Sequence, residues 1–262
     1  MTNLEKNTLY NLECIEGMKR IEDKSIDMIL CDLPYGTTNC KWDEIIPFDL
    51  MWEQYKRVIK DNGAIVLTAS QPFTSKLIAS NMNWFRYEWI WKKGEHVTGF
   101  PNAKKMPLKN HENICVFYKK LPTYNPQGII KIKPKQVKKN KGMQALGKNN
   151  DSLSKYHVVR YKNYPKSVIS VPRESKTFHP TQKPRDLFEY IIKTYTNEGE
   201  TVLDNCMGSG TTAVAADNTN RNWVGFELDK DYCSQAIQRI NENRERLNLP
   251  IAEVMNIDMK GV

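Results

Sequence analysis

The chain has 262 residues, with 40% hydrophobic and 26% charged side chains, which is ordinary for a folded soluble protein and allows one large domain or a domain with an insertion. The formal net charge of +9 is compatible with an anionic partner but does not by itself identify one. No apolar run approaches membrane-spanning length and the N-terminus lacks the regions of a signal peptide, so we expect neither a membrane partner nor export.

Short apolar or aromatic runs alternate with helical patterns along most of the chain. Strands are predicted at Asp27–Cys31, Ala64–Thr68, Arg86–Trp91, Ile114–Tyr118, Val168–Val171, Thr201–Leu203 and Trp223–Phe226. Helices are predicted at Leu50–Lys60, Phe73–Asn81, Arg185–Thr196, Thr211–Asn218 and Asp231–Leu247. This alternation is typical of βαβ units and a mostly parallel sheet. No convincing helix separates the third and fourth strands, so a local antiparallel element is expected there.

The first predicted strand runs directly into the turn Asp32-Leu33-Pro34-Tyr35. Pro34 stiffens this turn and disfavours helix at Leu33, which leaves a carboxylate, a carbonyl and an aromatic ring at a strand end. This set suits methylation of an aryl amine, whose delocalised lone pair makes it a poor nucleophile. Two acceptors on its N–H bonds can orient that lone pair, and a ring can hold a flipped base. In isolation the segment would be an ordinary turn.

The middle of the chain is strongly basic. From Lys131 to Lys166 there are eleven basic residues against the single acid Asp151, a charge of +10, so the rest of the chain is near −1. A solvated surface loop explains part of this stretch. The interleaved rings of Tyr156, Tyr161 and Tyr164 favour nucleic-acid contact, because cations neutralise phosphates and rings stack on bases.

A glycine turn follows the strand predicted at Thr201–Leu203. Gly208 and Gly210 allow a sharp turn and a close backbone approach to a ligand, and Thr211 or Thr212 can begin the next helix. The following strand ends at Glu227, an acid well placed to accept hydrogen bonds from ribose hydroxyls. This pattern indicates a nucleoside cofactor. A dinucleotide site stays open, although alanine stands where that motif has its third glycine.

Cysteine usage argues against a metal site. No two cysteines form a C-x-x-C pair and no histidine cluster accompanies them, so we expect no zinc and a reducing, intracellular compartment. The six are Cys14, Cys31, Cys40, Cys115, Cys206 and Cys233.

With these motifs in place, the sequence resembles the permuted, β-class DNA amino-methyltransferases, which make N6-methyladenine and N4-methylcytosine. Asp32-Leu33-Pro34-Tyr35 matches their catalytic motif and precedes the cofactor turn, as in that class. The segment 178–184 also looks like that class. Three positions depart from the family pattern: Leu33 replaces a proline, Cys206 a phenylalanine, and Glu13 a more frequent aspartate. An initial Asp is commoner in adenine enzymes, so the resemblance favours N6 of adenine.

The resemblance implies a doubly wound α/β, Rossmann-like methyltransferase sheet, S-adenosylmethionine as cofactor and no metal. The expected catalytic residues are Asp32, Leu33, Pro34 and Tyr35. The expected cofactor-binding residues are Glu13, Asp32, Thr181, Lys183, Asp204, Cys206, Met207, Gly208, Ser209, Gly210, Thr211, Thr212 and Glu227. The expected DNA-binding residues are Lys104, Lys105, Lys109, Lys131, Lys133, Lys135, Lys138, Lys139, Tyr156, Tyr161 and Tyr164.

The resemblance also sets the expected domain organisation and partners. Residues 1–91 would form the catalytic half, 92–176 a target-recognition insertion, and 177–262 the cofactor-binding half of one methyltransferase domain. The expected partner is double-stranded DNA, in the cytoplasm of a bacterium or of the host of a phage. The sequence leaves a homodimer and a cognate restriction nuclease open.

Three other functions stay open on the sequence alone. N4-cytosine methylation uses the same motifs. Methylation of RNA adenine or of a protein glutamine amide is disfavoured, because those families usually place the cofactor turn before the Pro-Tyr motif. A catalytically silent DNA-binding module with the same fold is disfavoured by the intact Asp32 and glycine turn, while Leu33 and Cys206 keep it open.

Overall fold

The fold was analysed in a computed structural model, which describes residues 4–37, 43–138, 156–175, 177 and 182–256. These residues divide into two compact units, 1–125 with 167–262, and 126–166. Among the described residues, no helix is long and apolar enough to cross a membrane.

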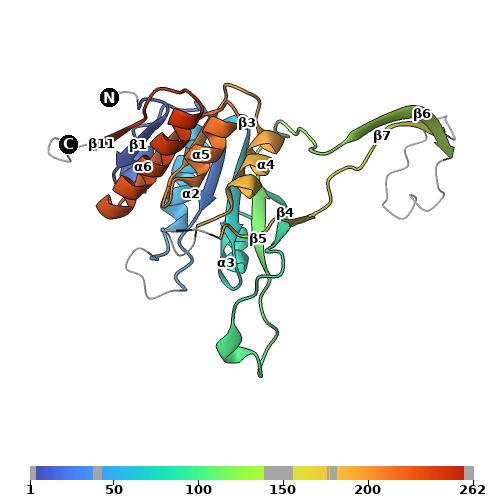
Figure 1. Cartoon of the computed structure of the whole chain (residues 1–262), viewed down its shortest axis with the longest axis horizontal. Helices are drawn as coiled ribbons and strands as arrows, with labels where there is room; N and C mark the ends of the chain where they lie inside the picture. The colour runs from blue at the N-terminus through green and yellow to red at the C-terminus, as the bar shows by residue number, and fades with distance from the viewer. Residues whose placement is uncertain (1–3, 38–42, 139–155, 176, 178–181, 257–262) are drawn as a thin grey trace. The chain divides into compact units, whose positions relative to one another are not determined.

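The first unit is built around one mixed sheet (Figure 1). Its described strands follow the order β11-β1-β10-β9-β2-β3-β5-β4-β8. The six strands from β11 to β3 are parallel to one another, whereas β5 is antiparallel to both β3 and β4. The predicted α/β class and the predicted antiparallel element are therefore confirmed. The bounds are β1 Thr8–Asn11, β2 Ile26–Asp32, β3 Ile59–Ala69, β4 Phe85–Lys92, β5 His111–Phe117, β8 Val168–Ser170, β9 Thr201–Asp204, β10 Asn222–Glu227 and β11 Glu253–Asn256.

Helices cover both faces of this sheet. The helices α4, α5 and α6 contribute to one hydrophobic core and α1, α2 and α3 to the other, so the sheet is enclosed in the doubly wound manner. The spacing of the buried residues along a helix explains this packing. In α4 the buried residues recur every three to four positions, which presents one apolar stripe to the sheet. The bounds are α1 Cys14–Met18, α2 Phe48–Val58, α3 Phe73–Ser80, α4 Arg185–Tyr195, α5 Thr211–Asn218 and α6 Lys230–Arg246.

The middle of the sheet contains a topological switch point. The strand β2 pairs with β3 on one side and with β9 on the other, and the chain proceeds from β2 to β3 but from β9 to β10. Asp32 ends β2 and Asp204 ends β9, so both acids lie at the carboxyl edge of the parallel strands. Open α/β sheets bind ligands in the crevice at such a point.

The second unit contains a two-stranded antiparallel ribbon. It is formed by β6 (Ile130–Lys138) and β7 (Tyr156–Lys162), with Lys131 opposite Tyr161 and Lys138 opposite Tyr156. Sequence patterning did not identify these strands, because their many lysines resemble those of a solvated loop. Residues 92–176 were expected to form the target-recognition insertion. Of this range, β5 and β8 belong to the large sheet, and residues 126–166 form the separate unit.

Candidate active site

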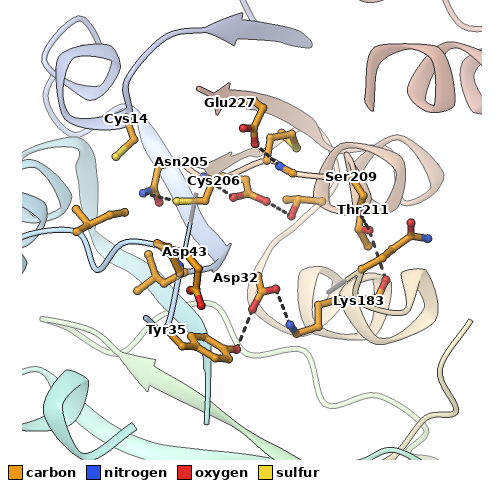
Figure 2. A pocket seen from close by; sticks show the side chains of 18 of the residues that line it. Cys14, Asp32, Tyr35, Asp43, Lys183, Asn205, Cys206, Ser209, Thr211 and Glu227 are labelled. Carbon is orange, nitrogen blue, oxygen red and sulfur yellow. Dashed lines mark hydrogen bonds and ion pairs between the residues drawn. The ribbon is translucent and has the colours of Figure 1, made fainter. Parts of the chain in front are cut away.

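A cavity of about 630 Å³ opens at the carboxyl edge of β2 and β9. Its walls come from the Asp-Leu-Pro-Tyr turn after β2, the glycine turn after β9 and the end of β10. Figure 2 shows Asp32, Tyr35 and Lys183 directed toward one another, with Glu227 on the glycine-turn side. The volume is in the range of small-molecule and cofactor sites. The strand ends that the sequence singled out therefore meet in one cavity.

Asp32 is held at the end of β2 by three donors. Its Oδ1 accepts hydrogen bonds from the Tyr35 hydroxyl at 2.8 Å and from the Thr68 hydroxyl, and its Oδ2 accepts one from Lys183 Nζ at 2.5 Å. Burial, followed by the negative charge of Asp32, raises the pKa of Tyr35 well above its usual value, so the phenol stays a donor. A carboxylate oxygen has two lone pairs, so Oδ2 keeps acceptor capacity toward the cavity.

The ring of Tyr35 is itself fixed by packing. It stacks on Phe73 of α3 with ring centroids 5.1 Å apart and planes 27° apart. The backbone that follows is also held, because the amides of Gly36 and Thr37 donate to the buried carboxylate of Asp43 at 2.9 and 2.8 Å. The turn is therefore ordered on both sides of the Pro34 peptide.

Four charged side chains form an alternating row beside this turn. Lys183 Nζ lies 2.5 Å from Asp32 Oδ2 and 3.5 Å from Glu112 Oε2, and Lys93 Nζ lies 2.5 Å from Glu112 Oε1. Burial alone would raise the pKa of Glu112, but the two lysines hold it below its usual value. Burial alone would lower the pKa of Lys183, but Asp32 and Glu112 raise it. Glu112 and Lys183 are therefore expected to carry charge near neutral pH.

The glycine turn is shaped by Asp204 at the end of β9. Its Oδ1 accepts from the Cys206 amide at 3.0 Å and its Oδ2 from the Thr212 hydroxyl at 2.5 Å, which ties the strand end to the first turn of α5. Burial raises the pKa of Asp204 to about 6. Gly208 and Gly210 have φ of 51° and 76°, in the left-handed region that favours glycine.

Glu227 ends β10 beside this turn and lines the cavity. Its Oε2 accepts from the Gly208 amide at 2.8 Å and its Oε1 from the Asp229 amide at 2.9 Å. Burial raises its pKa above the usual value. A carboxylate fixed at this strand end has the chemistry to accept the two hydroxyls of a ribose. Together with the left-handed glycines, it makes the cavity suitable for S-adenosylmethionine.

The structure brings nearly all of the predicted cofactor residues to this cavity. Those that line it are Glu13, Asp32, Lys183, Asp204, Cys206, Met207, Gly208, Ser209, Thr211, Thr212 and Glu227. Gly210 precedes α5 as its N-cap, and Thr181 lies outside the described residues. The Glu13 carboxylate accepts from the Glu16 amide at 2.9 Å and so caps α1. Leu33, Pro34 and Tyr35 also line the cavity.

The predicted DNA-binding residues are distributed over two places. Lys109 lines the cavity, and Lys104 and Lys105 are exposed in the loop between β4 and β5. The others lie in the second unit, namely Lys131, Lys133, Lys135, Lys138, Tyr156, Tyr161 and Tyr164, except Lys139, which is outside the described residues.

Sequence reasoning missed the residues that complete the site from distant parts of the chain. Thr68, Lys93 and Glu112 sit on β3, beside β4 and on β5, and nothing in their local sequence marks them. Among the described residues, no group of three or more metal-ligating side chains is arranged to hold an ion.

Comparison with known proteins agrees with this geometry. The family model described as DNA methylase, for N6 and N4 methyltransferases, matches residues 26–238. The Type II methyltransferase M.HpaI of Haemophilus parainfluenzae is 28% identical over 87% of this chain and 72% of its own length. The DNA adenine methyltransferase YhdJ of Escherichia coli K12 is 24% identical over 90% of this chain and 83% of its own. The crystal structure of the M1.HpyAVI–SAM complex superposes with a TM-score of 0.61 at 25% identity, covering 88% of this chain and 98% of that one.

Proposed function

Because the chain belongs to the N6 and N4 DNA methylase family, we propose that this S-adenosylmethionine-dependent DNA methyltransferase modifies N6 of adenine. The observation that carries the proposal is the Asp32 carboxylate, fixed at the end of β2 in the cavity that also holds Glu227. The likeness to a DNA adenine methyltransferase over 90% of the chain supports adenine as the base. The Type II methyltransferases among the relatives of this chain associate it with enzymes of restriction and modification systems.

In this proposal the Asp-Leu-Pro-Tyr turn binds the amino group of a flipped base. Asp32 Oδ2 has a lone pair to accept one N–H, and the Leu33 carbonyl accepts the other. Two acceptors on one nitrogen draw it toward tetrahedral geometry and aim its lone pair at the methyl donor. The ring of Tyr35, fixed on Phe73, offers an aromatic surface to the base. Most of the rate comes from positioning and electrostatics.

The cofactor side of the cavity is assigned to the glycine turn and Glu227. Glu227 would accept the ribose hydroxyls, and the turn 206–212 would let the backbone approach the cofactor closely. S-adenosylmethionine supplies a methyl group on a positively charged sulfur. When the new C–N bond forms, the bond between the methyl carbon and sulfur breaks and leaves its electron pair on a neutral thioether. The amino nitrogen becomes cationic and then loses a proton. Asp32, already accepting that N–H, is the nearest base in this arrangement.

The ribbon β6–β7 is assigned to DNA contact. Its described residues and those that flank it carry seven basic side chains, all exposed, and no acid: Lys131, Lys133, Lys135, Lys138, Arg160, Lys162 and Lys166. The major groove of DNA admits a two-stranded ribbon, and lysines neutralise phosphates. The logarithm of the DNA-binding constant falls linearly with the logarithm of the salt concentration. Replacing Lys131 and Lys133 with Gln should make this slope shallower by about one for each of these lysines that binds a phosphate. Lys119→Gln, in the other unit, is the matched control and should leave the slope unchanged.

Expression in a host free of DNA methylation tests the proposal. Host DNA is digested to nucleosides and analysed by mass spectrometry, and the modified sites are mapped by direct sequencing. We expect N6-methyladenine at one short recurring sequence. N4-methylcytosine would overturn the choice of base, and unmodified DNA from soluble, S-adenosylmethionine-binding protein would overturn the activity.

A further inference from the structure

The loop between β4 and β5, residues 93–110, rises beside the active-site cavity. Ala69 at the end of β3 pairs with Asn113, and Lys92 at the end of β4 pairs with His111, so the loop leaves the sheet at its carboxyl edge. Thr98 and Lys109 both line the cavity, and they pair through two backbone hydrogen bonds of 2.8 and 3.0 Å. The base of the loop is therefore part of the cavity mouth.

Side-chain contacts fix this base to its surroundings. Lys109 Nζ donates to the hydroxyl of Ser70, which follows β3 and also lines the cavity. On the other limb, Arg173 and His96 form a hydrogen bond of 3.0 Å. Figure 1 shows the loop, in blue-green, projecting from the ends of β4 and β5. The loop is held where it leaves the sheet and extends beyond that point.

Its tip is exposed, carries two large apolar side chains and is ordered by its own backbone. Every residue from 99 to 107 is exposed, and among them Phe100 is 64% and Met106 57% accessible. Asn102 and Ala103 donate to the carbonyls of Gly99 and Phe100, and the amides of Lys105 and Met106 both donate to Asn102. These bonds form the short 3-10 helix η1 (Phe100–Asn102). The tip thus presents an aromatic side chain on a folded support.

The charge of the tip fits the DNA backbone. Lys104 and Lys105 are its charged residues, and no acid lies between Gly99 and Pro107. A duplex that delivers a base to the cavity must place its neighbouring base pairs and phosphates next to the cavity mouth. An exposed ring flanked by two lysines suits that place, because proteins that kink DNA insert apolar wedges between base steps while cations bind the phosphates.

We propose that Phe100 acts as a wedge, entering the duplex beside the target adenine and occupying the stack that the base leaves when it enters the cavity. Lys104 and Lys105 would bind the adjoining phosphates. The inference rests on the proposed function, because it requires a base to be extruded into the cavity. Phe100 is a positioning residue in this role, since it touches neither the cofactor nor the reacting nitrogen.

The test compares two duplexes that carry the mapped target site. In one the target adenine faces thymine, and in the other it faces an abasic position, so that extrusion costs less. With the paired duplex, we expect Phe100→Ala to lower kcat/KM at least about tenfold, because unstacking without a wedge costs a few times the thermal energy. With the abasic duplex, the variant should lie within about threefold of the wild-type protein.

Two controls separate a wedge from a general defect. Phe100→Leu keeps apolar bulk and should retain most of the activity on the paired duplex. Met82→Ala removes an exposed apolar side chain between α3 and β4, at the opposite edge of the sheet, and should leave the rates on both duplexes unchanged. Calorimetry should give the same S-adenosylmethionine affinity for all of the variants, since the tip lies outside the cavity lining.

Fluorescence of 2-aminopurine at the target position supplies a readout independent of methyl transfer. The wild-type protein should raise the fluorescence on binding, and Phe100→Ala should not. Equal loss of activity on both duplexes, or no loss on either, would overturn the wedge. Wild-type protein inactive on both duplexes would instead overturn the proposed function, and the wedge with it.

Discussion

The ammonium of Lys183 lies 2.5 Å from Asp32 Oδ2, although the two residues are 151 positions apart in the sequence. This contact joins the turn after β2 to the segment that precedes α4. It supplies a buried positive charge to the carboxylate assigned to the amino group of the base. A positive charge at this distance favours the charged form of a carboxylate.

Removing this cation should make the reaction sensitive to acid. In Lys183→Met, Asp32 and Glu112 face each other without a positive charge between them. Glu112 loses the larger of the two lysine charges that lower its pKa, so its pKa rises. We expect kcat at neutral pH to fall about 10- to 100-fold, and the acid limb of the pH profile to move to higher pH. Lys183→Arg keeps the charge and should shift the profile less. A profile of unchanged shape for Lys183→Met would contradict the role of Lys183.

The alternating row of charges should also stabilise the fold. Glu112→Gln removes the carboxylate that Lys93 contacts and leaves Lys183 with Asp32, which should lower the free energy of unfolding by about 3 kcal/mol. Adding Lys93→Met restores the balance of charge and should recover at least about 1 kcal/mol of that loss. Urea denaturation measures both effects.

An exposed ion pair provides the matched control for that row. Lys119 pairs with Asp61 at 3.1 Å, and its side chain is 49% exposed, so Lys119→Met should change the free energy of unfolding far less than Glu112→Gln does. If the losses of unfolding free energy for Glu112→Gln and Lys93→Met simply add in the double variant, the charges of the buried row do not interact.

Glu227 should control the affinity for the cofactor. Glu227→Gln weakens the acceptor that we assign to the ribose hydroxyls, and hydrogen bonds to a charged group are the stronger ones. We expect the Kd for S-adenosylmethionine to rise about 10- to 100-fold in calorimetry. Glu253→Gln, an exposed substitution on β11, is the control. An unchanged Kd for Glu227→Gln would place the ribose elsewhere.

Asp204 should make stability depend on pH. Its pKa is raised from 3.8 to about 6 by burial. Between about pH 4 and pH 6 the unfolded carboxyl ionises while the folded one stays protonated, so the unfolding free energy falls as the pH rises. The stabilisation is complete below about pH 4 and lost above about pH 6, and it amounts to about 3 kcal/mol.

The difference between wild-type protein and Asp204→Asn isolates this contribution. Both proteins share every other titrating group, so these cancel in the difference between their unfolding free energies. Urea denaturation at about pH 4 and about pH 7, without cofactor, should show the wild-type protein losing about 3 kcal/mol relative to the variant. A difference that stays constant with pH would mean that Asp204 keeps an ordinary pKa.

The residues that could be found from the sequence are those that end strands. A carboxylate after an apolar run, as at Asp32 and Glu227, marks the carboxyl edge of a parallel sheet, where the edges of all parallel strands meet. The glycine turn was found because positive φ at Gly208 and Gly210 has a clear residue preference. Local pattern was therefore sufficient to place both turns at strand ends, and the strand order brings them to one cavity.

Other parts of the site depend on strand pairing that the sequence does not display. Lys93 contacts Glu112 because β4 and β5 are antiparallel with Lys92 opposite His111. A shift of one residue in the register of these strands would place the two side chains on opposite faces of the sheet. The four-residue strand β1 was missed because so short a run has no readable period. The ribbon β6–β7 was missed because its lysines resemble those of a solvated loop.

Methylation of a defined duplex by purified wild-type protein and by Asp32→Asn shows whether this chain methylates N6 of adenine through the Asp32 carboxylate. Labelled methyl transfer to N6 of adenine is measured alongside S-adenosylmethionine affinity for both proteins. We expect N6-methyladenine from the wild-type protein, at least about a 100-fold lower rate from the variant, and similar cofactor affinities for the two. An Asp32→Asn protein that methylates adenine at the wild-type rate would show that the Asp32 carboxylate does not bind the amino group.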